Sequence, residues 1–241
     1  WYVLGALGLA TFVLCLAFLR NRPSEMGLVP IGESQAESTK RAAEKKASAL
    51  DWGLVYKSKV LWQLAAIYFA FGFSYIIYST FFVRYLVKEA GFDANGAGTL
   101  WLQVGIVTAL SGFIWGAASD RWGRRIPLIA VFALQGLSFI VFGLSHELFA
   151  VYFSAGIFAV TAWSVPALMS ALAGDIFGAR LAPAAFGLMT IIFGIGQIVS
   201  PTLAGAIADS TGSFAQAFLI AGLFSILGAA GALALKTLPS T

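Results

Sequence analysis

Charged residues gather in one short turn of the sequence, between two apolar runs. The turn carries one acid and three bases within six residues, namely Asp120, Arg121, Arg124 and Arg125. Charges of this density cannot lie in hydrocarbon, so the turn predicts a water-facing hairpin. Asp120 is expected to pair with an arginine or with a helix N-terminus, while Gly116 and Gly123 permit a tight turn. The chemistry predicted here is ion pairing at a membrane surface.

A second set of residues has the types needed to bind a small solute, because polar and aromatic side chains recur inside apolar segments. The candidate substrate contacts are Tyr68, Tyr75, Ser79, Gln103, Trp163 and Gln197. At about 100° per residue, Tyr68, Tyr75 and Ser79 share one face of a helix. Lipid offers the amides of Gln103 and Gln197 no partner, so both should face protein or water. A hydrogen bond between helices, without a ligand, is the alternative for each residue.

Residues for catalysis or metal binding are sparse. His146 is the sole histidine and stands beside Glu147 in a short turn, and Cys15 is the sole cysteine. Neither a metal site nor a histidine-activated nucleophile has its partners, and no GxxxxGK phosphate-binding loop occurs. The sequence therefore predicts no enzyme, no metal and no cofactor. Asp, Glu and Lys are absent from the depth of the later apolar segments, which leaves those segments without an evident proton carrier.

The elements that must position these residues are membrane-length helices. The chain is 59% hydrophobic and 11% charged, whereas a soluble domain is about 25% charged. Seven segments are long enough to cross about 30 Å of hydrocarbon at about 1.5 Å per residue. They are residues 1–19, 60–83, 97–118, 126–144, 148–173, 184–207 and 214–235. This pattern predicts an all-α, polytopic membrane protein.

The spacing of the segments predicts three parts, which are a lone transmembrane helix at 1–19, a cytoplasmic linker at 20–59 and a six-helix bundle at 60–241. The linker is rich in Ala, Glu, Lys and Ser over 35–50. This stretch is either a basic surface helix at anionic lipid or a solvated helix. Because the chain starts at Trp1 inside an apolar segment, we expect an N-terminal part to be missing.

Positive charges predict the orientation, because Lys and Arg are retained on the cytoplasmic side of membranes. Of the 15 basic residues, only Arg84 and Lys88 fall on one side of the predicted spans. The other side, which includes Lys236, is therefore expected to be cytoplasmic. The net charge of +4 reflects this orientation rather than affinity for nucleic acid.

The turn GAASDRWGRR over 116–125 resembles the loop signature of the major facilitator superfamily (MFS), G-x-x-x-D-R-x-G-R-R/K. Further similar stretches follow in the expected order, at 20–28, 75–86, 174–180 and 196–214. The resemblance covers nearly the whole chain and implies an MFS-type helix bundle. It makes 1–19 helix six and 60–241 the C-terminal six-helix half, with the N-terminal half missing. The match is to bacterial members, which implies the bacterial cytoplasmic membrane.

The resemblance also implies roles for individual residues. Asp120 in the signature Gly116, Asp120, Arg121, Gly123, Arg124 and Arg125 would latch the two halves in the outward-facing state, or the turn would enforce topology alone. Asp175 and Arg180 would form a second part of this cytoplasmic network or a plain surface pair. Four residues would let their helices flex, with close packing as the alternative role. They are Pro166, Gly196, Pro201 and Gly205.

The function implied by the resemblance is secondary active transport of a small organic solute by alternating access. Its cavity would lie between two pseudo-symmetric halves, and proton coupling is inferred from the family. The implied partners are a small-molecule substrate, the lipid bilayer and the missing half, within a monomer. A seven-helix receptor or sensor is the alternative, because seven spans with an outer N-terminus also fit that class.

Overall fold

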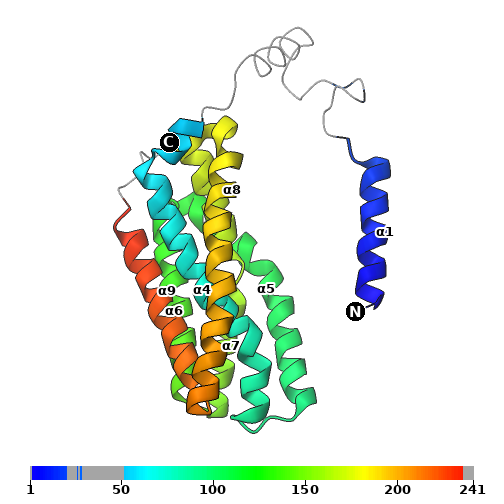
Figure 1. Cartoon of the computed structure of the whole chain (residues 1–241), viewed down its shortest axis with the longest axis vertical. Coiled ribbons are helices and arrows are strands. Elements are labelled where there is room, and N and C mark those ends of the chain that lie inside the picture. Colours follow the sequence, from blue (N-terminus) through cyan, green and yellow to red (C-terminus); the bar gives the residue numbers. More distant parts are fainter. Residues whose placement is uncertain (1, 21–25, 27, 29–51, 236–241) are drawn as a thin grey trace. The chain divides into compact units, whose positions relative to one another are not determined.

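The computed structural model describes residues 2–20, 26, 28 and 52–235. The chain divides into two units, residues 1–51 and 52–241 (Figure 1). In the first unit, α1 is an apolar helix of 17 residues, Tyr2–Phe18. The basic helix predicted in the linker and the C-terminal Lys236 lie outside the described residues.

The second unit is a bundle of helices, and its described residues contain no strand. Its elements are α3 (Trp52–Tyr56), α4 (Lys59–Lys88), α5 (Ala94–Trp122), α6 (Arg125–Leu144), α7 (Leu148–Thr161), α8 (Ser164–Thr211) and α9 (Ala215–Leu233). Five helical stretches in the described chain are long and apolar enough to cross a membrane, when 148–211 is counted as one. The fold class is therefore all-α, as predicted.

Short-range capping sets where the first two long helices begin. Ser58 and Asp93 each accept a hydrogen bond from a backbone N–H of the following first turn, at 3.4 and 3.2 Å. As a result α4 and α5 start at the residue after a polar cap and run beyond the apolar spans 60–83 and 97–118. The polar ends of both helices thus project past the length that hydrocarbon requires.

α8 consists of two helices joined at Gly178, where the backbone has φ 68° and ψ 165°. Such a positive φ is available to glycine at little cost, because it has no Cβ. The chain turns at this residue, so that the rising and falling parts of α8 are separate helices of 164–177 and 179–211 (Figure 1). The segment predicted to begin at 184 is accordingly helical from five residues earlier.

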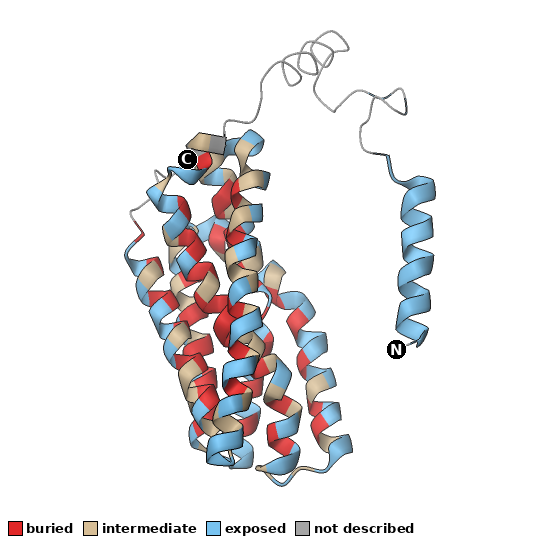
Figure 2. Ribbon diagram, viewed as in Figure 1, coloured by how far each residue is buried: buried red, intermediate tan, exposed pale blue. Residues whose placement is uncertain are grey.

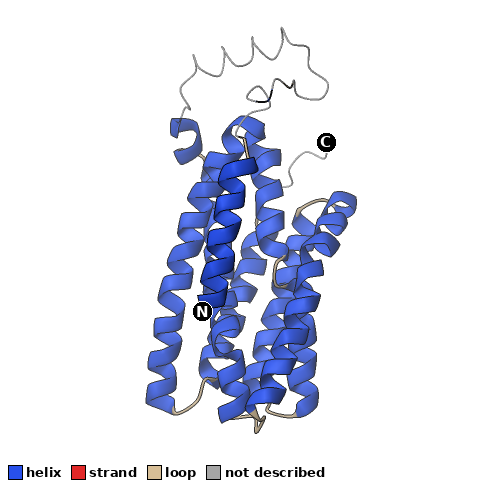
Figure 3. Cartoon of the chain, turned by 90° about the vertical axis from the view of Figure 1, so that its right-hand side faces the viewer, coloured by secondary structure: helices blue, strands red, loops and turns tan. Residues whose placement is uncertain are grey.

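α4 is the central helix of the bundle and packs against α8 and α9, while α9 also packs along α6 and α5 packs on α7. Each helix has a most apolar window of 18 residues, and the buried share of that window is 61% in α4, 28% in α5 and 17% in the stretch 148–211. Figure 2 shows the buried residues along the inward-facing sides of the helices, and Figure 3 shows the same bundle from the side. α5 and α8 therefore present long exposed apolar faces.

Candidate functional site

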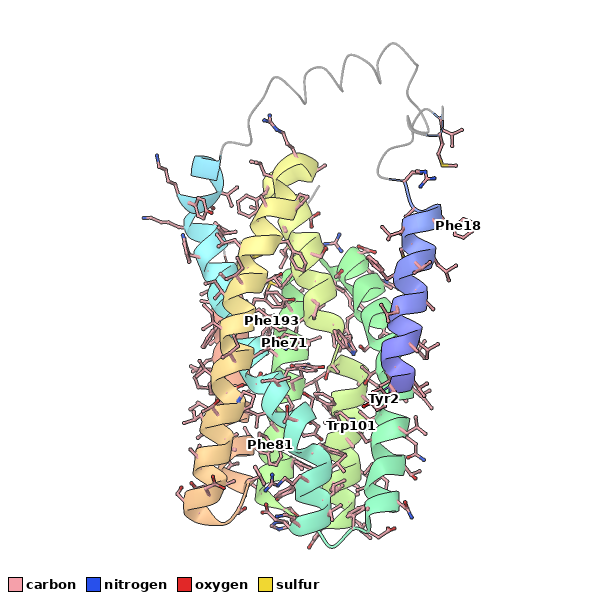
Figure 4. The ribbon with its side chains drawn as sticks, turned by 45° about the vertical axis from the view of Figure 1, so that its right-hand side comes forward. Tyr2, Phe18, Phe71, Phe81, Trp101 and Phe193 are labelled. Carbon is pink, nitrogen blue, oxygen red and sulfur yellow. The ribbon has the colours of Figure 1, made fainter. Side chains whose placement is uncertain are left out.

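Six aromatic residues of α4, α7, α8 and the junction between the last two stack in a row that we call the aromatic wall. They are Tyr68, Phe71, Tyr75, Phe158, Trp163 and Phe193. Ring centroids lie 4.5 Å apart for Tyr68 and Phe193, 5.2 Å for Phe71 and Tyr75, and 6.0 Å for Tyr75 and Trp163. Figure 4 shows Phe71 and Phe193 close together midway along the bundle. The row unites three predicted contacts, Tyr68, Tyr75 and Trp163.

The aromatic wall is closed at one end and open at the other. Tyr68 is only 3% exposed, because it stacks on Phe71, Phe186 and Phe193. Trp163 is 54% exposed, and its indole offers both an apolar face and an N–H donor. Trp163 is therefore the exposed end of the wall, whereas Tyr68 is packed among other aromatic rings.

α4 and α8 approach closely because each helix has a glycine that faces the backbone of the other helix. A Cβ added to Gly72 would lie 2.4 Å from the carbonyl oxygen of Phe193, and one added to Gly196 would lie 2.8 Å from that of Phe69. Small residues permit this kind of helix contact in lipid. Gly196 thus has a packing role, whereas a Cβ on Gly205 would meet no atom within 4 Å.

The wall ends at a break between α7 and α8, at residues 162–163. Side chains of α5 and α6 satisfy backbone groups there: Trp115 Nε1 donates to Val160 O (2.8 Å), Gln135 Nε2 donates to Thr161 O (3.0 Å), and Trp163 N–H donates to Ser111 Oγ (3.1 Å). Pro166, in the first turn of α8, lacks the N–H that would continue the helix across the break. Non-helical backbone at membrane depth requires such protein partners, and here they hold Trp163 in place.

Three residues at this break were not singled out by the sequence reasoning. Ser111 and Gln135 are fully buried, and the indole N–H of Trp115 donates to a neighbouring helix. Thr108 Oγ1, Ser164 Oγ and Gln135 Oε1 are also buried and bond no described residue. Pro166 was the available signal, since a mid-span proline requires polar side chains on the facing helices.

Gln197 lies on α8, one turn after Phe193 of the wall, and is half-buried. Pro201 has no N–H, so the carbonyl oxygen of Gln197 loses its helical partner. The hydroxyl of Ser200 is fully buried and bonds no described residue. An amide, a carbonyl and a hydroxyl with free hydrogen-bonding capacity are therefore concentrated on this turn of α8.

The other two predicted contacts differ in their surroundings. Ser79 lies one turn beyond Tyr75, is hydrogen-bonded to its side chain and also donates to the carbonyl oxygen of Ile76 at 3.3 Å. Gln103 is exposed on α5. Its neighbour Trp101 turns its ring toward Phe158 at 6.1 Å, so Gln103, about 200° further round the helix, points away from the wall. The structure thus does not bring Gln103 to the aromatic wall.

The charged turn after α5 forms an ion-pair network centred on Arg124. Its guanidinium lies 2.5 Å from Asp120 Oδ1 and 2.9 Å from Asp175 Oδ2, and it also donates to Ser119 Oγ at 2.6 Å. The hydrogen bond to Asp175, ahead of that to Asp120, raises the pKa of the Arg124 guanidinium above its ordinary value. Arg124 therefore stays charged and ties the end of α5 to the first helix of α8.

The remaining residues of the turn are placed as follows. Gly123 has φ 75°, as a tight turn requires, but Gly116 lies inside α5 and does not form the turn. Arg125 donates to the carbonyl oxygen of Leu233 and so joins α6 to the end of α9. Exposed residues near this end of the bundle are Arg121, in the last turn of α5, and Arg180, two residues after Gly178.

The fold and the charged turn define the class, a transporter-like bundle of membrane helices, and comparison with known proteins gives its family. A family model described as "Uncharacterised MFS-type transporter YbfB" matches residues 1–233. The chain therefore belongs to this family of MFS-type transporters, and the resemblance seen in the sequence is confirmed. The family is described as one of transporters, which favours a transporter over the alternative of a seven-helix receptor or sensor.

Several of the curated relatives are named as transporters of organic acids. The chain is 26% identical to a probable sulfoacetate transporter of Cupriavidus necator, across 98% of the chain and 57% of that protein. It is 25% identical to a hexuronate transporter of Bacillus subtilis (90% and 52%) and 28% identical to a putative tartrate transporter of Agrobacterium vitis (89% and 50%). The chain thus spans about half the length of the curated relatives that it matches.

Proposed function

We propose that this chain forms half of a secondary active transporter that moves a small organic acid across the membrane by alternating access. The observation that carries the proposal is the aromatic wall, which runs from a packed end at Tyr68 to an open end at Trp163, inside a bundle of membrane-length helices. A site that is mostly apolar with a few convergent polar groups is typical of small-molecule binding.

The substrate contacts that we propose are Tyr75, Trp163 and Gln197. Tyr75 and Trp163 supply stacking surface and polar tips, while Gln197 and its unpaired carbonyl supply hydrogen bonds. The class of substrate follows from the relatives, which are named for sulfoacetate, hexuronate and tartrate. All three are small organic acids.

We propose that a second half of the transporter covers the exposed faces of α5 and α8, since the relatives are about twice as long as the chain. In this arrangement the Arg124 network is a latch at the cytoplasmic end, and Asp120 reaches toward the other half. The complete protein is a monomer in the bacterial plasma membrane with its C-terminus in the cytoplasm, as the distribution of basic residues favours.

Proton coupling is part of the proposal. In the described helices of the second unit, Asp, Glu and Lys occur only near helix ends, at Lys59, Lys88, Asp120, Asp175 and Asp209. Intramembrane carboxylates are the usual proton relays of transporters. The residue that titrates during transport therefore belongs to the second half of the protein.

Uptake by the natural full-length protein in proteoliposomes tests the proposal. Sulfoacetate, D-glucuronate and tartrate are supplied with and without an inward proton gradient, and empty liposomes serve as the control. We expect saturable uptake of at least one of these acids, increased by the gradient. Uptake equal to that of empty liposomes for all three would contradict the proposal.

A further inference from the structure

A hollow of about 400 Å³ is lined by residues from the last turns of α4 and α8 and from the start of α9, at the end of the bundle opposite the Arg124 network. Its lining residues are Arg84, Lys88, Glu89, Ala208, Asp209, Gly212 and Phe214. We propose that this hollow is a binding site for a small hydroxycarboxylate, which it collects before the acid enters the transport pathway. The inference deepens the proposed function and rests on it for the direction of transport, but not for binding.

Glu89 also lines the hollow, and its carboxylate holds the loop before α9. Its carboxylate accepts a hydrogen bond from Ser213 Oγ at 2.5 Å and another from the backbone N–H of Phe214 at 3.0 Å. A carboxylate at this position also complements the dipole at the start of α9. Each oxygen of Glu89 thereby accepts one hydrogen bond, and the loop before α9 is fixed against the end of α4.

The fixed loop in turn positions Arg84. The ring of Phe214 stacks on Phe81 at 4.6 Å, and the guanidinium carbon of Arg84 lies 5.3 Å from the centroid of the same ring. Stacking on an aromatic face leaves the N–H groups at the edge of the guanidinium free. Arg84 is thus oriented in advance for a bidentate bond to a carboxylate.

Lys88 lies one turn after Arg84 on α4 and adds a second positive charge to the same hollow. No carboxylate oxygen of the described residues lies within 4.0 Å of either cationic group. Two exposed cations without an ion-pair partner, held on one helix face above a hollow, attract a small anion and can close on it.

Asp209 determines which anions fit. Its exposed carboxylate lines the same hollow and would repel a ligand that carries only negative charge. A hydroxycarboxylate avoids this repulsion, because its hydroxyl can donate to Asp209 while its carboxylate binds Arg84 and Lys88. The arrangement therefore selects acids that also carry a hydroxyl group over simple carboxylates.

The site is tested by calorimetric titration of the natural full-length protein in lipid nanodiscs with D-glucuronate. D-Glucose, which has the same ring without the carboxylate, is the matched ligand control. We expect Arg84→Gln and Lys88→Gln each to weaken glucuronate binding about tenfold, since each removes a charge-assisted hydrogen bond. The affinity of Arg84→Lys for glucuronate should lie between those of wild type and Arg84→Gln, because lysine keeps the charge and loses the bidentate fork. Lys59→Gln, at the other end of α4, should bind as wild type does.

Asp209→Ala should change the affinities for a hydroxycarboxylate and for a simple carboxylate in opposite directions, which identifies the ligand class. Binding of glucuronate should weaken, because its hydroxyl loses an acceptor, whereas binding of acetate should strengthen, because a repelling charge is gone. The proposal is overturned if wild-type protein does not bind glucuronate, if it binds glucose equally well, or if Arg84→Gln and Lys88→Gln bind glucuronate like wild type.

Uptake by the same preparations separates this site from the transport proposal. If glucuronate binding depends on Arg84 but no acid is taken up, the binding site in the hollow is supported and the proposed transport is contradicted. If an acid is taken up and Arg84→Gln leaves both glucuronate binding and the KM for uptake unchanged, transport is supported and the binding site in the hollow is contradicted. With both proposals correct, Arg84→Gln raises the KM and leaves kcat within about twofold of wild type.

Discussion

Single side chains complete the hydrogen bonding of the backbone where the helices of this bundle are interrupted. Trp115 and Gln135 bond the carbonyl oxygens of Val160 and Thr161, two residues that precede the break in the 148–177 segment. A buried carbonyl without a partner costs about 1–3 kcal/mol, and no water replaces the partner in lipid. These bonds explain how Trp163 can leave the helix and still occupy a defined position in the wall.

Gln135→Leu tests this account, because leucine has a similar size and no amide to donate. We expect the free energy of unfolding in detergent to fall by about 1–3 kcal/mol as Thr161 loses its donor. Gln103→Leu makes the same chemical change on the exposed side of α5 and should leave the midpoint of unfolding unchanged. Equal midpoints for the two variants would show that the bond at the break adds no stability.

Arg124 links two helices, because it bonds carboxylates of α5 and α8 at once. Arg124→Gln should shift the protein away from the outward-facing state by about 1.4- to fivefold, because exposed ion pairs contribute about 0.2–1 kcal/mol. The readout is the alkylation rate of a Ser79→Cys variant by a membrane-impermeant thiol reagent, in a Cys15→Ser background. Lys59→Gln removes a charge elsewhere and should not change the rate. A latch role is refuted if Arg124→Gln leaves the rate at its wild-type value.

Among the elements, the α4 and α8 pair sets the position of the wall. Gly72 and Gly196 bring the two helices into backbone contact, and Phe193 stacks on Tyr68 as a result. Gly205 lies further along α8, where an added Cβ would meet nothing among the described atoms. The glycines of one helix therefore differ in role, although they look alike in the sequence.

Alanine substitutions separate the two kinds of glycine. Gly72→Ala and Gly196→Ala should each lower the free energy of unfolding by about 1–3 kcal/mol, because the backbone oxygen facing the new methyl group cannot move aside alone. Gly205→Ala should raise it by up to about 1 kcal/mol through higher helix propensity. Thermal unfolding in detergent measures all three, and a loss of stability in Gly205→Ala as large as in Gly196→Ala would contradict the assignment.

The sequence was sufficient to predict the all-α membrane class, because the length of an apolar segment is a local property. It did not reveal that Gln103 points away from the wall, since Trp101 decides the rotation of α5 through a contact with Phe158. Gly116 was likewise expected in the turn, yet α5 continues past it to Trp122. Contacts between distant helices determine both outcomes, and a single sequence does not contain them.

The second unit as a whole has a buried core around α4 and long exposed apolar faces on α5 and α8. Exposed apolar surface of this extent is compatible with lipid or with another protein surface. Membership of the MFS-type family and relatives about twice as long favour a second half of the transporter on part of it. In the arrangement that we propose, the aromatic wall would face a chamber enclosed by both halves.

The central claim is that the open end of the aromatic wall contacts the transported acid, and uptake kinetics of wall variants test it most directly. With the full-length protein in proteoliposomes and an acid that the wild type transports, Trp163→Ala and Gln197→Ala should lower kcat/KM about tenfold or more, since each removes a contact to the substrate. Trp62→Ala, which alters another half-exposed tryptophan that donates to Tyr56 O, should stay within about twofold of wild type. Wild-type kcat/KM in folded, membrane-inserted Trp163→Ala and Gln197→Ala would contradict the account.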